Sequence, residues 1–172
     1  MAGFGENRGL HDYLVEGVRR TLFEPEAPLV WPPNRAGWTV EHLDWAEPSD
    51  GGTEWWPSLA GAVLMLETSE EAPPPDLLTR FLRILALNGD LQQLAGIVFG
   101  RPGGADLAVE DHTAYDDAIL QVVRREQGLD DLPVVTNVDF GHTDPIWTVP
   151  QGTPTRIDPA VETITFLDTA VA

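Results

Sequence analysis

Hydrophobic and polar residues follow one another along the chain in patterns that predict three helices and five strands. Apolar side chains recur near the 3.6-residue helical period in residues 10–22 and share one face of residues 76–87, and a third helix is predicted over 113–127. Short apolar runs, typical of strands buried on both faces, occupy residues 60–66, 95–99 and 133–137. Two more strands are predicted at 38–45, where apolar and polar residues alternate, and at 163–167.

The order of these elements favours an α/β fold. Strands and helices alternate between residues 60 and 137, which is the pattern of right-handed crossovers in a parallel sheet. No helix is predicted after that region, although strand structure continues. We therefore expect one domain built as a layered sandwich, with a parallel core sheet and additional β strands, rather than a doubly wound sheet.

Composition excludes several classes of protein. The chain of 172 residues has 10 basic residues and 28 acidic ones, so its formal charge is 10 − 28 = −18. This charge argues against nucleic-acid and membrane partners, which both need clustered cations. Because Cys is absent, disulfides, thiolate zinc sites and cysteine nucleophiles are excluded. The chain contains neither a membrane-length apolar run nor a signal-peptide pattern, so a cytoplasmic protein is expected.

Polar residues follow two of the predicted buried strands. Glu67 comes directly after the strand at 60–66, and His142 lies in the polar stretch after the strand at 133–137. If these strands are parallel neighbours, both side chains lie at one edge of the sheet, where α/β proteins bind ligands. A carboxylate bound to one imidazole nitrogen would fix the tautomer and leave the other nitrogen free as a base. Alternatively, Glu67 caps a helix or pairs with an Arg, and His142 only closes a turn.

Other candidate sites have weaker support. Asp139, His142 and Asp144 form a D-x-x-H-x-D cluster, but three ligands on one turn would strain to share a metal ion, so no metal is predicted. The remaining histidines are interpreted as surface or helix-start residues: His11, His42 and His112. The glycine-rich residues 100–104 contain Pro and lack the Lys of a phosphate loop, so no cofactor is predicted.

A nucleophile is not evident in these residues. The chain has three serines, Ser49, Ser58 and Ser69, and none of them lies in a G-x-S-x-G elbow. Ser69 is best interpreted as a turn or helix-start residue.

Three segments nevertheless resemble one peptidase family. Residues 61–73, G-A-V-L-M-L-E-T-S-E-E-A-P, resemble the "G-x-x-L-x-L-E" strand of the LD-carboxypeptidase family of serine peptidases. Residues 132–145, L-P-V-V-T-N-V-D-F-G-H-T-D-P, followed by V-P-Q-G at 149–152, resemble its second block, and residues 96–101 are similar to the strand between them. The family includes muramoyltetrapeptide carboxypeptidases and microcin C self-immunity peptidases.

The resemblance implies a Ser-His-Glu triad in which Glu67 and His142 are the catalytic residues present. Glu70 and Glu71 are the near alternatives for the carboxylate, and Glu67 is preferred because it ends the strand. In the family, the nucleophilic Ser and the oxyanion-hole amides belong to a separate N-terminal domain. Residues 1–172 therefore resemble the C-terminal domain alone, of the swivelling type, with the nucleophile domain absent. We expect such a chain to be inactive by itself.

The resemblance also implies the substrates, through the activity of the family. Its members act in the cytoplasm on the bond between an L-centre and a following D-amino acid in peptidoglycan peptides. The microcin branch, which the D-F-G-H-T-D-P form favours, cleaves an amide in a peptidyl nucleotide. Residues 50–57 replace a longer family segment at the active-site rim, and the resemblance also implies a homodimer. The alternative function is a non-catalytic binding or interaction domain that keeps only the fold.

Overall fold

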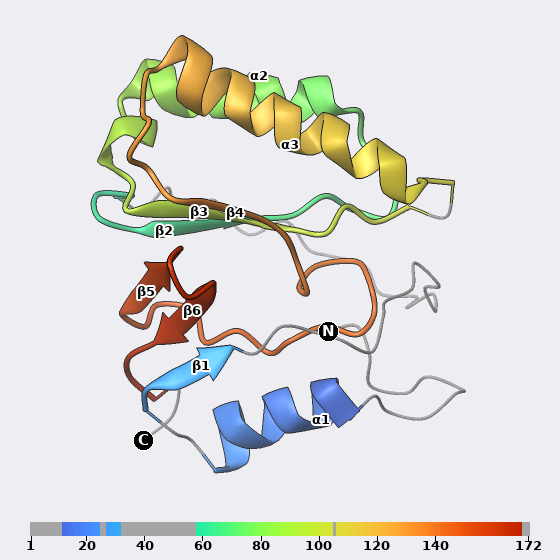
Figure 1. Cartoon of the computed structure of the whole chain (residues 1–172), viewed down its shortest axis with the longest axis vertical. Coiled ribbons are helices and arrows are strands. Elements are labelled where there is room, and N and C mark those ends of the chain that lie inside the picture. Colours follow the sequence, from blue (N-terminus) through green and yellow to red (C-terminus); the bar gives the residue numbers. More distant parts are fainter. Residues whose placement is uncertain (1–11, 25–26, 32–57, 105, 170–172) are drawn as a thin grey trace, which may run out of the picture.

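The elements stack in layers. The computed structural model describes residues 12–24, 27–31, 58–104 and 106–169. Two helices lie above a parallel sheet, an antiparallel sheet lies below it, and a further helix covers the opposite side (Figure 1). This arrangement confirms the predicted α/β sandwich with a parallel core sheet. The strand predicted at 38–45 lies outside the described residues.

The parallel sheet has the order β2-β3-β4. Its strands are β2 (Val63–Leu66), β3 (Gly96–Gly100) and β4 (Val134–Val138), and both neighbouring pairs are parallel. Only β3 is buried along its whole length; β2 and β4 are half-buried. The expectation that all three are buried on both faces is therefore wrong for β2 and β4, because these strands are the edges of the described sheet.

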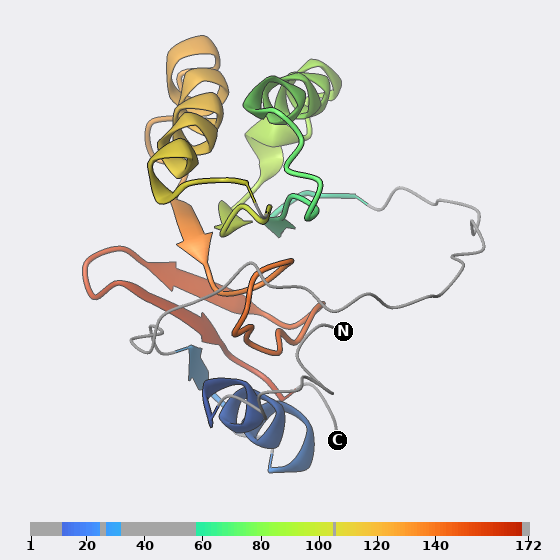
Figure 2. The ribbon, with the colours of Figure 1, turned by 90° about the vertical axis from the view of Figure 1, so that its right-hand side faces the viewer.

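Helices α2 (Pro75–Asn88) and α3 (His112–Leu120) cover one face of this sheet (Figure 2). Helix α3 continues as a π-helical turn over Gln121–Glu126, so the pair accounts for the helices predicted at 76–87 and 113–127. Proline suits the first turn of α2, and Gly89 ends the helix in the left-handed conformation at φ +79°. Between the helices and the sheet lies the larger core: Leu82, Leu85, Leu91, Leu94, Ile97, Phe99, Tyr115, Ile119, Val122 and Val123.

The antiparallel sheet has the order β1-β6-β5. It contains β1 (Leu29–Trp31), β5 (Thr155–Asp158) and β6 (Thr163–Phe166), of which only β6 was expected from the sequence. Helix α1 (Asp12–Val18), with a π-helical turn at Arg19–Phe23, lies on the far side of this sheet, where a helix was predicted over 10–22 (Figure 1). A second core joins the two sheets: Leu29, Val98, Trp147, Ile164 and Phe166. Of the helices in the described ranges, none has the length and apolar character needed to cross a bilayer.

Candidate functional site

Glu67 and His142 meet at the carboxyl edge of the parallel sheet. Glu67 follows the last residue of β2, and its Oε2 lies 3.0 Å from Nδ1 of His142, a residue 75 positions further along the chain. Both side chains are partly open to solvent, at 43% for Glu67 and 36% for His142. The predicted approach of these two side chains is therefore present, and their catalytic role stays a prediction.

The route by which His142 reaches Glu67 differs from the expected one. The strands β2 and β4 are not neighbours, because β3 lies between them. The segment after β4 packs against the end of β3, where a β-carbon at Gly100 would lie 2.6 Å from the carbonyl oxygen of Phe140. A β-carbon at Gly103 would similarly lie 3.0 Å from the carbonyl oxygen of His142. The glycines of residues 100–104 therefore give the His142 segment room to pack against this loop.

Glu70 lies on the other side of the imidazole ring. Its Oε2 is 3.3 Å from Nε2 of His142, and its side chain is 46% exposed. His142 is thus held between two carboxylates, one at each ring nitrogen. The expectation that the second nitrogen stays open is wrong in this structure, because Glu70 approaches it from the turn that follows β2. Glu71, the other alternative carboxylate, is exposed.

A buried ion pair lies below this site. Arg101 follows β3 and Asp139 follows β4, and Nη1 of Arg101 is 2.5 Å from Oδ1 of Asp139. The two side chains are only 12% and 8% exposed. The backbone carbonyl of Asp139 also accepts a hydrogen bond from the amide of Trp147 at 2.7 Å. The pair fastens the start of the His142 segment to the end of β3.

This ion pair was not identified from the sequence. The available signal was two opposite charges, each placed directly after one of two neighbouring apolar strands. Arg101 pairs with Asp139, and the contact described for Glu67 is with His142 rather than with an Arg. Within the described ranges, no three His, Asp or Glu side chains gather as a potential metal site.

His112 is the first residue of α3, and it is buried rather than on the surface. Burial lowers the pKa of its imidazole, and the positive charge of Arg101 lowers it further, whereas Asp116 and Asp111 oppose the change. Asp116 also accepts hydrogen bonds from the Asn137 side-chain amide at 3.3 and 3.4 Å. These polar groups connect the start of α3 to the strand end that precedes His142.

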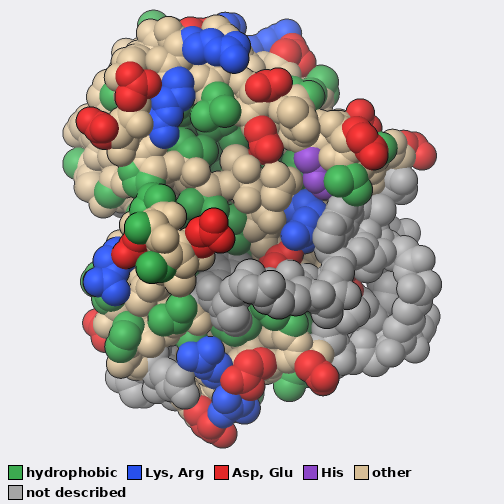
Figure 3. Space-filling model, viewed as in Figure 1, with side chains coloured by type: hydrophobic (Ala, Val, Ile, Leu, Met, Phe, Trp, Pro, Cys, Tyr) green, Lys and Arg blue, Asp and Glu red, His purple; other side chains and the backbone are tan. Residues whose placement is uncertain are grey.

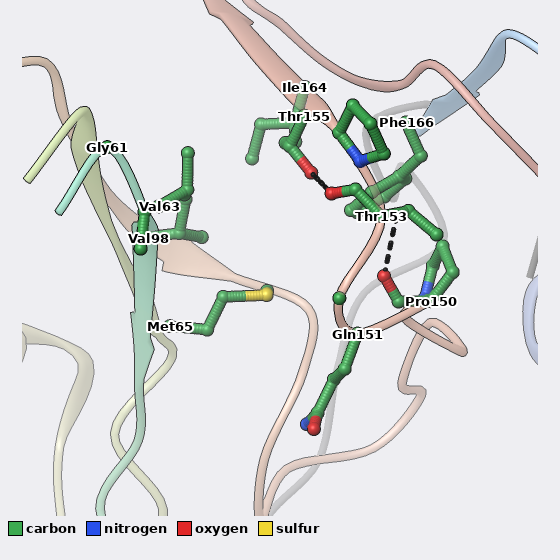
Figure 4. A pocket seen from close by; sticks show the side chains of 13 residues that line it. Gly61, Val63, Met65, Val98, Pro150, Gln151, Thr153, Thr155, Ile164 and Phe166 are labelled. Atoms are coloured by element: carbon green, nitrogen blue, oxygen red, sulfur yellow. Dashed lines mark hydrogen bonds between the residues drawn. The ribbon is translucent and has the colours of Figure 1, made fainter. Parts of the chain in front are cut away.

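A cavity of about 590 Å³ lies between the two sheets (Figure 4). Val63 and Met65 line it from β2, and alternate residues of a strand point to the same face. Opposite them lie Ile164 and Phe166 of β6 and the loop 150–154. Neither Glu67 nor His142 lines the cavity, so the Glu67–His142 pair and the cavity are separate features.

Acidic side chains are exposed at many places on the described surface. In the view of Figure 3 they are scattered over the upper and lower layers, and a histidine side chain also reaches the surface. The exposed carboxylates nearest to His142 are Glu67 and Glu70. A ligand that approaches His142 from solvent therefore meets these carboxylates first.

Comparison with known proteins identifies the family. Residues 49–157 match the LD-carboxypeptidase C-terminal domain, and the chain belongs to this family. A Treponema pallidum protein named "Putative carboxypeptidase" is 32% identical over 110 residues, which are 62% of this chain and 30% of that protein. The microcin C7 self-immunity protein MccF of Escherichia coli is 29% identical over 108 residues, or 62% of this chain and 29% of that protein. The chain thus spans about a third of these curated relatives.

Solved structures agree with this assignment. The MccF-like protein from Streptococcus pneumoniae, in complex with AMP, has 29% identity and a TM-score of 0.53 over 64% of this chain and 31% of its own. The muramoyltetrapeptide carboxypeptidase from Oxalobacter formigenes has 20% identity and a TM-score of 0.65 over 98% of this chain and 59% of its own. At that identity the second match supports the fold alone.

Proposed function

We propose that this chain provides the His-Glu part of an LD-carboxypeptidase-type serine peptidase. The observation that carries the proposal is the 3.0 Å contact between Glu67 Oε2 and His142 Nδ1, formed at the carboxyl edge of the sheet by residues far apart in sequence. In this proposal Glu67 accepts a hydrogen bond from Nδ1–H and so fixes the ring, which leaves Nε2 as the base. The serine and the oxyanion-hole amides come from a nucleophile domain that is not within these residues.

The proposed reaction is an acyl transfer in two steps. Nε2 of His142 takes the proton of the serine hydroxyl while the oxygen attacks the scissile carbonyl, and the leaving amine departs with that proton. Water then attacks the resulting ester while Nε2 of His142 takes a proton from it, and His142 returns that proton to the departing serine oxygen, which releases the acid and restores the serine hydroxyl. Glu67 stays ionised throughout and stabilises the imidazolium that forms in each step.

The proposed substrates are small amides of two kinds. One is the bond between an L-centre and a D-amino acid in peptidoglycan peptides, as the carboxypeptidase relatives suggest. The other is the amide of a peptidyl nucleotide, suggested by the similarity to MccF and to an MccF-like protein that binds AMP. For both substrates, the proposed compartment of the activity is the cytoplasm.

A complementation assay tests the proposal. Without a serine and its oxyanion hole, the His-Glu pair has no alkoxide to generate, so we expect the purified chain alone to hydrolyse neither substrate. A nucleophile domain from an LD-carboxypeptidase, added as a separate chain or fused before Met1, is expected to give turnover. His142→Ala and Glu67→Ala should abolish that turnover, whereas Glu162→Ala, a change at an exposed residue of the β5–β6 connection, should not.

Two outcomes would contradict the proposal. Turnover by the chain alone that disappears in His142→Ala would show that the chain needs no added nucleophile. Failure of every combination to turn over substrate, while the domains associate, would favour the alternative function of a non-catalytic binding domain. The contact of Glu70 with Nε2 is the observation that favours this alternative, because a binding domain does not need an open base.

A further inference from the structure

The second ring nitrogen of His142 faces a carboxylate that a Ser-His-Glu triad does not require. Glu70 Oε2 lies 3.3 Å from Nε2, which is the nitrogen opposite the one that contacts Glu67. A hydroxyl that transfers its proton to Nε2 must come within about 2.6–3.2 Å of that nitrogen. The Glu70 carboxylate therefore occupies the position that this hydroxyl would take.

The backbone that carries Glu70 is held in place. Residues 69–72 form a turn in which the Ala72 amide donates a hydrogen bond to the Ser69 carbonyl at 3.1 Å. The turn packs tightly on the loop after β3, because a β-carbon at Gly104 would lie 2.7 Å from the β-carbon of Ala72. The Glu70 side chain, by contrast, is 46% exposed. Rotation of the side chain alone would therefore uncover Nε2.

The protonation of the ring decides whether Glu70 binds it. Glu67 accepts a hydrogen bond from Nδ1, and Glu70 accepts one from Nε2 when that nitrogen also carries a proton. The cation that follows β3, Arg101, has its own carboxylate partner in Asp139. The neighbouring Glu71 is exposed and carries the same charge, so it provides a matched comparison for Glu70.

We propose that Glu70 is a gate on the base nitrogen of His142. In the chain as described, Glu70 covers Nε2, and its side chain must swing into solvent before His142 can take a proton from a nucleophile. This inference rests on the proposed role of His142 as the base. It adds that arrival of the nucleophile is coupled to rotation of one side chain, so the His-Glu pair is closed until its partner docks.

The gate can be tested on the full chain without any catalytic activity. Diethyl pyrocarbonate acylates an uncharged imidazole nitrogen, and the rate at His142 is followed by peptide mass spectrometry. At about pH 8, above the ordinary range of imidazole titration, this rate reports access to the ring. We expect Glu70→Ala to raise the rate at His142 several-fold, whereas Glu71→Ala leaves it at the wild-type value. Thermal unfolding of each variant verifies the fold.

The possible results of the two assays distinguish failure of the gate from failure of the proposed function. A wild-type rate in folded Glu70→Ala would overturn the gate, and so would an equal increase in Glu71→Ala, since general loss of negative charge would then be the cause. Because the assay needs no serine, a failed complementation assay together with the expected rates would reject the proposed function and leave Glu70 as a cover on Nε2. Successful complementation together with unchanged rates would reject the gate alone.

Discussion

Gly141 lies directly against the carboxylate of Glu67. A β-carbon at residue 141 would stand 2.3 Å from Glu67 Oε2, the same oxygen that contacts His142. Residue 141 also has a φ of +101°, a conformation that residues with side chains rarely adopt. Glycine at this position therefore allows the chain to bring the next residue, His142, onto the carboxylate.

Gly141→Ala should break the contact between Glu67 and His142. The added methyl group would displace the carboxylate, and the strained backbone should lower the free energy of unfolding by about 1–3 kcal/mol. Urea unfolding measures the stability, and the ring resonances of His142 in NMR spectra report the contact. Gly152→Ala is the control, because Gly152 has a φ of +77° but no atom near the added β-carbon. Unchanged His142 resonances in Gly141→Ala would contradict this account.

Arg101→Met should strongly destabilise the protein. Removal of the guanidinium leaves the carboxylate of Asp139, which is 8% exposed, buried without its ionic partner. Breaking a buried pair in this way costs about 3–5 kcal/mol. Arg80→Met breaks the exposed pair with Asp76, where the side chains are 68% and 55% exposed. That change should cost less than about 1 kcal/mol. Equal losses for the two variants in urea titrations would argue against a structural role for the buried pair.

His112 should make the protein less stable in mild acid. Burial, with the charge of Arg101, holds the pKa of His112 below its ordinary value of 6.5. The unfolded chain then binds a proton at a higher pH than the folded chain does, so the free energy of unfolding falls as the pH drops below about 6.5.

His112→Gln removes this titration. The difference in unfolding free energy between about pH 8 and pH 5.5 should therefore be smaller in the variant than in the wild type. Other groups titrate in both proteins and cancel in the comparison. The account fails if urea titrations at the two pH values give the same difference for both proteins.

Trp147→Ala should loosen helix α1. The Trp147 ring is 2% exposed and lies edge-on to Tyr13, with 4.9 Å between the ring centroids. A β-carbon at Gly17 of α1 would come within 3.1 Å of the same indole. Loss of a buried aromatic ring costs about 3–5 kcal/mol. Hydrogen exchange of the α1 amides should also accelerate.

The control for Trp147 is Leu87→Ala on α2, because the Leu87 side chain is 87% exposed. Its effect on the free energy of unfolding should stay within about 0.5 kcal/mol. If the α1 amides exchange at the same rate in Trp147→Ala and the wild type, then the indole does not hold α1 in place.

The sequence alone located the helices and strands that are encoded by local patterns of apolar residues. Continuous apolar runs marked β2, β3 and β4, and one-sided apolar spacing marked α2, because the spacing of apolar residues that favours a strand or a helix is a property of consecutive residues. The same patterns placed Glu67 and His142 at strand ends of one sheet edge. The quoted motifs also indicated the family to which the chain belongs.

The remaining features of the fold and of the candidate site depend on tertiary contacts. Strands β1 and β5 are short and lie beside prolines, and they exist because both pair with β6. The half-burial of β2 and β4 follows from their position at the edges of the described sheet, a property that no run of apolar residues records. The ion pair of Arg101 with Asp139 and the contact of Glu70 with His142 join separate loops. Such contacts depend on how the loops fold over the end of β3, and local sequence patterns carry no information about that geometry.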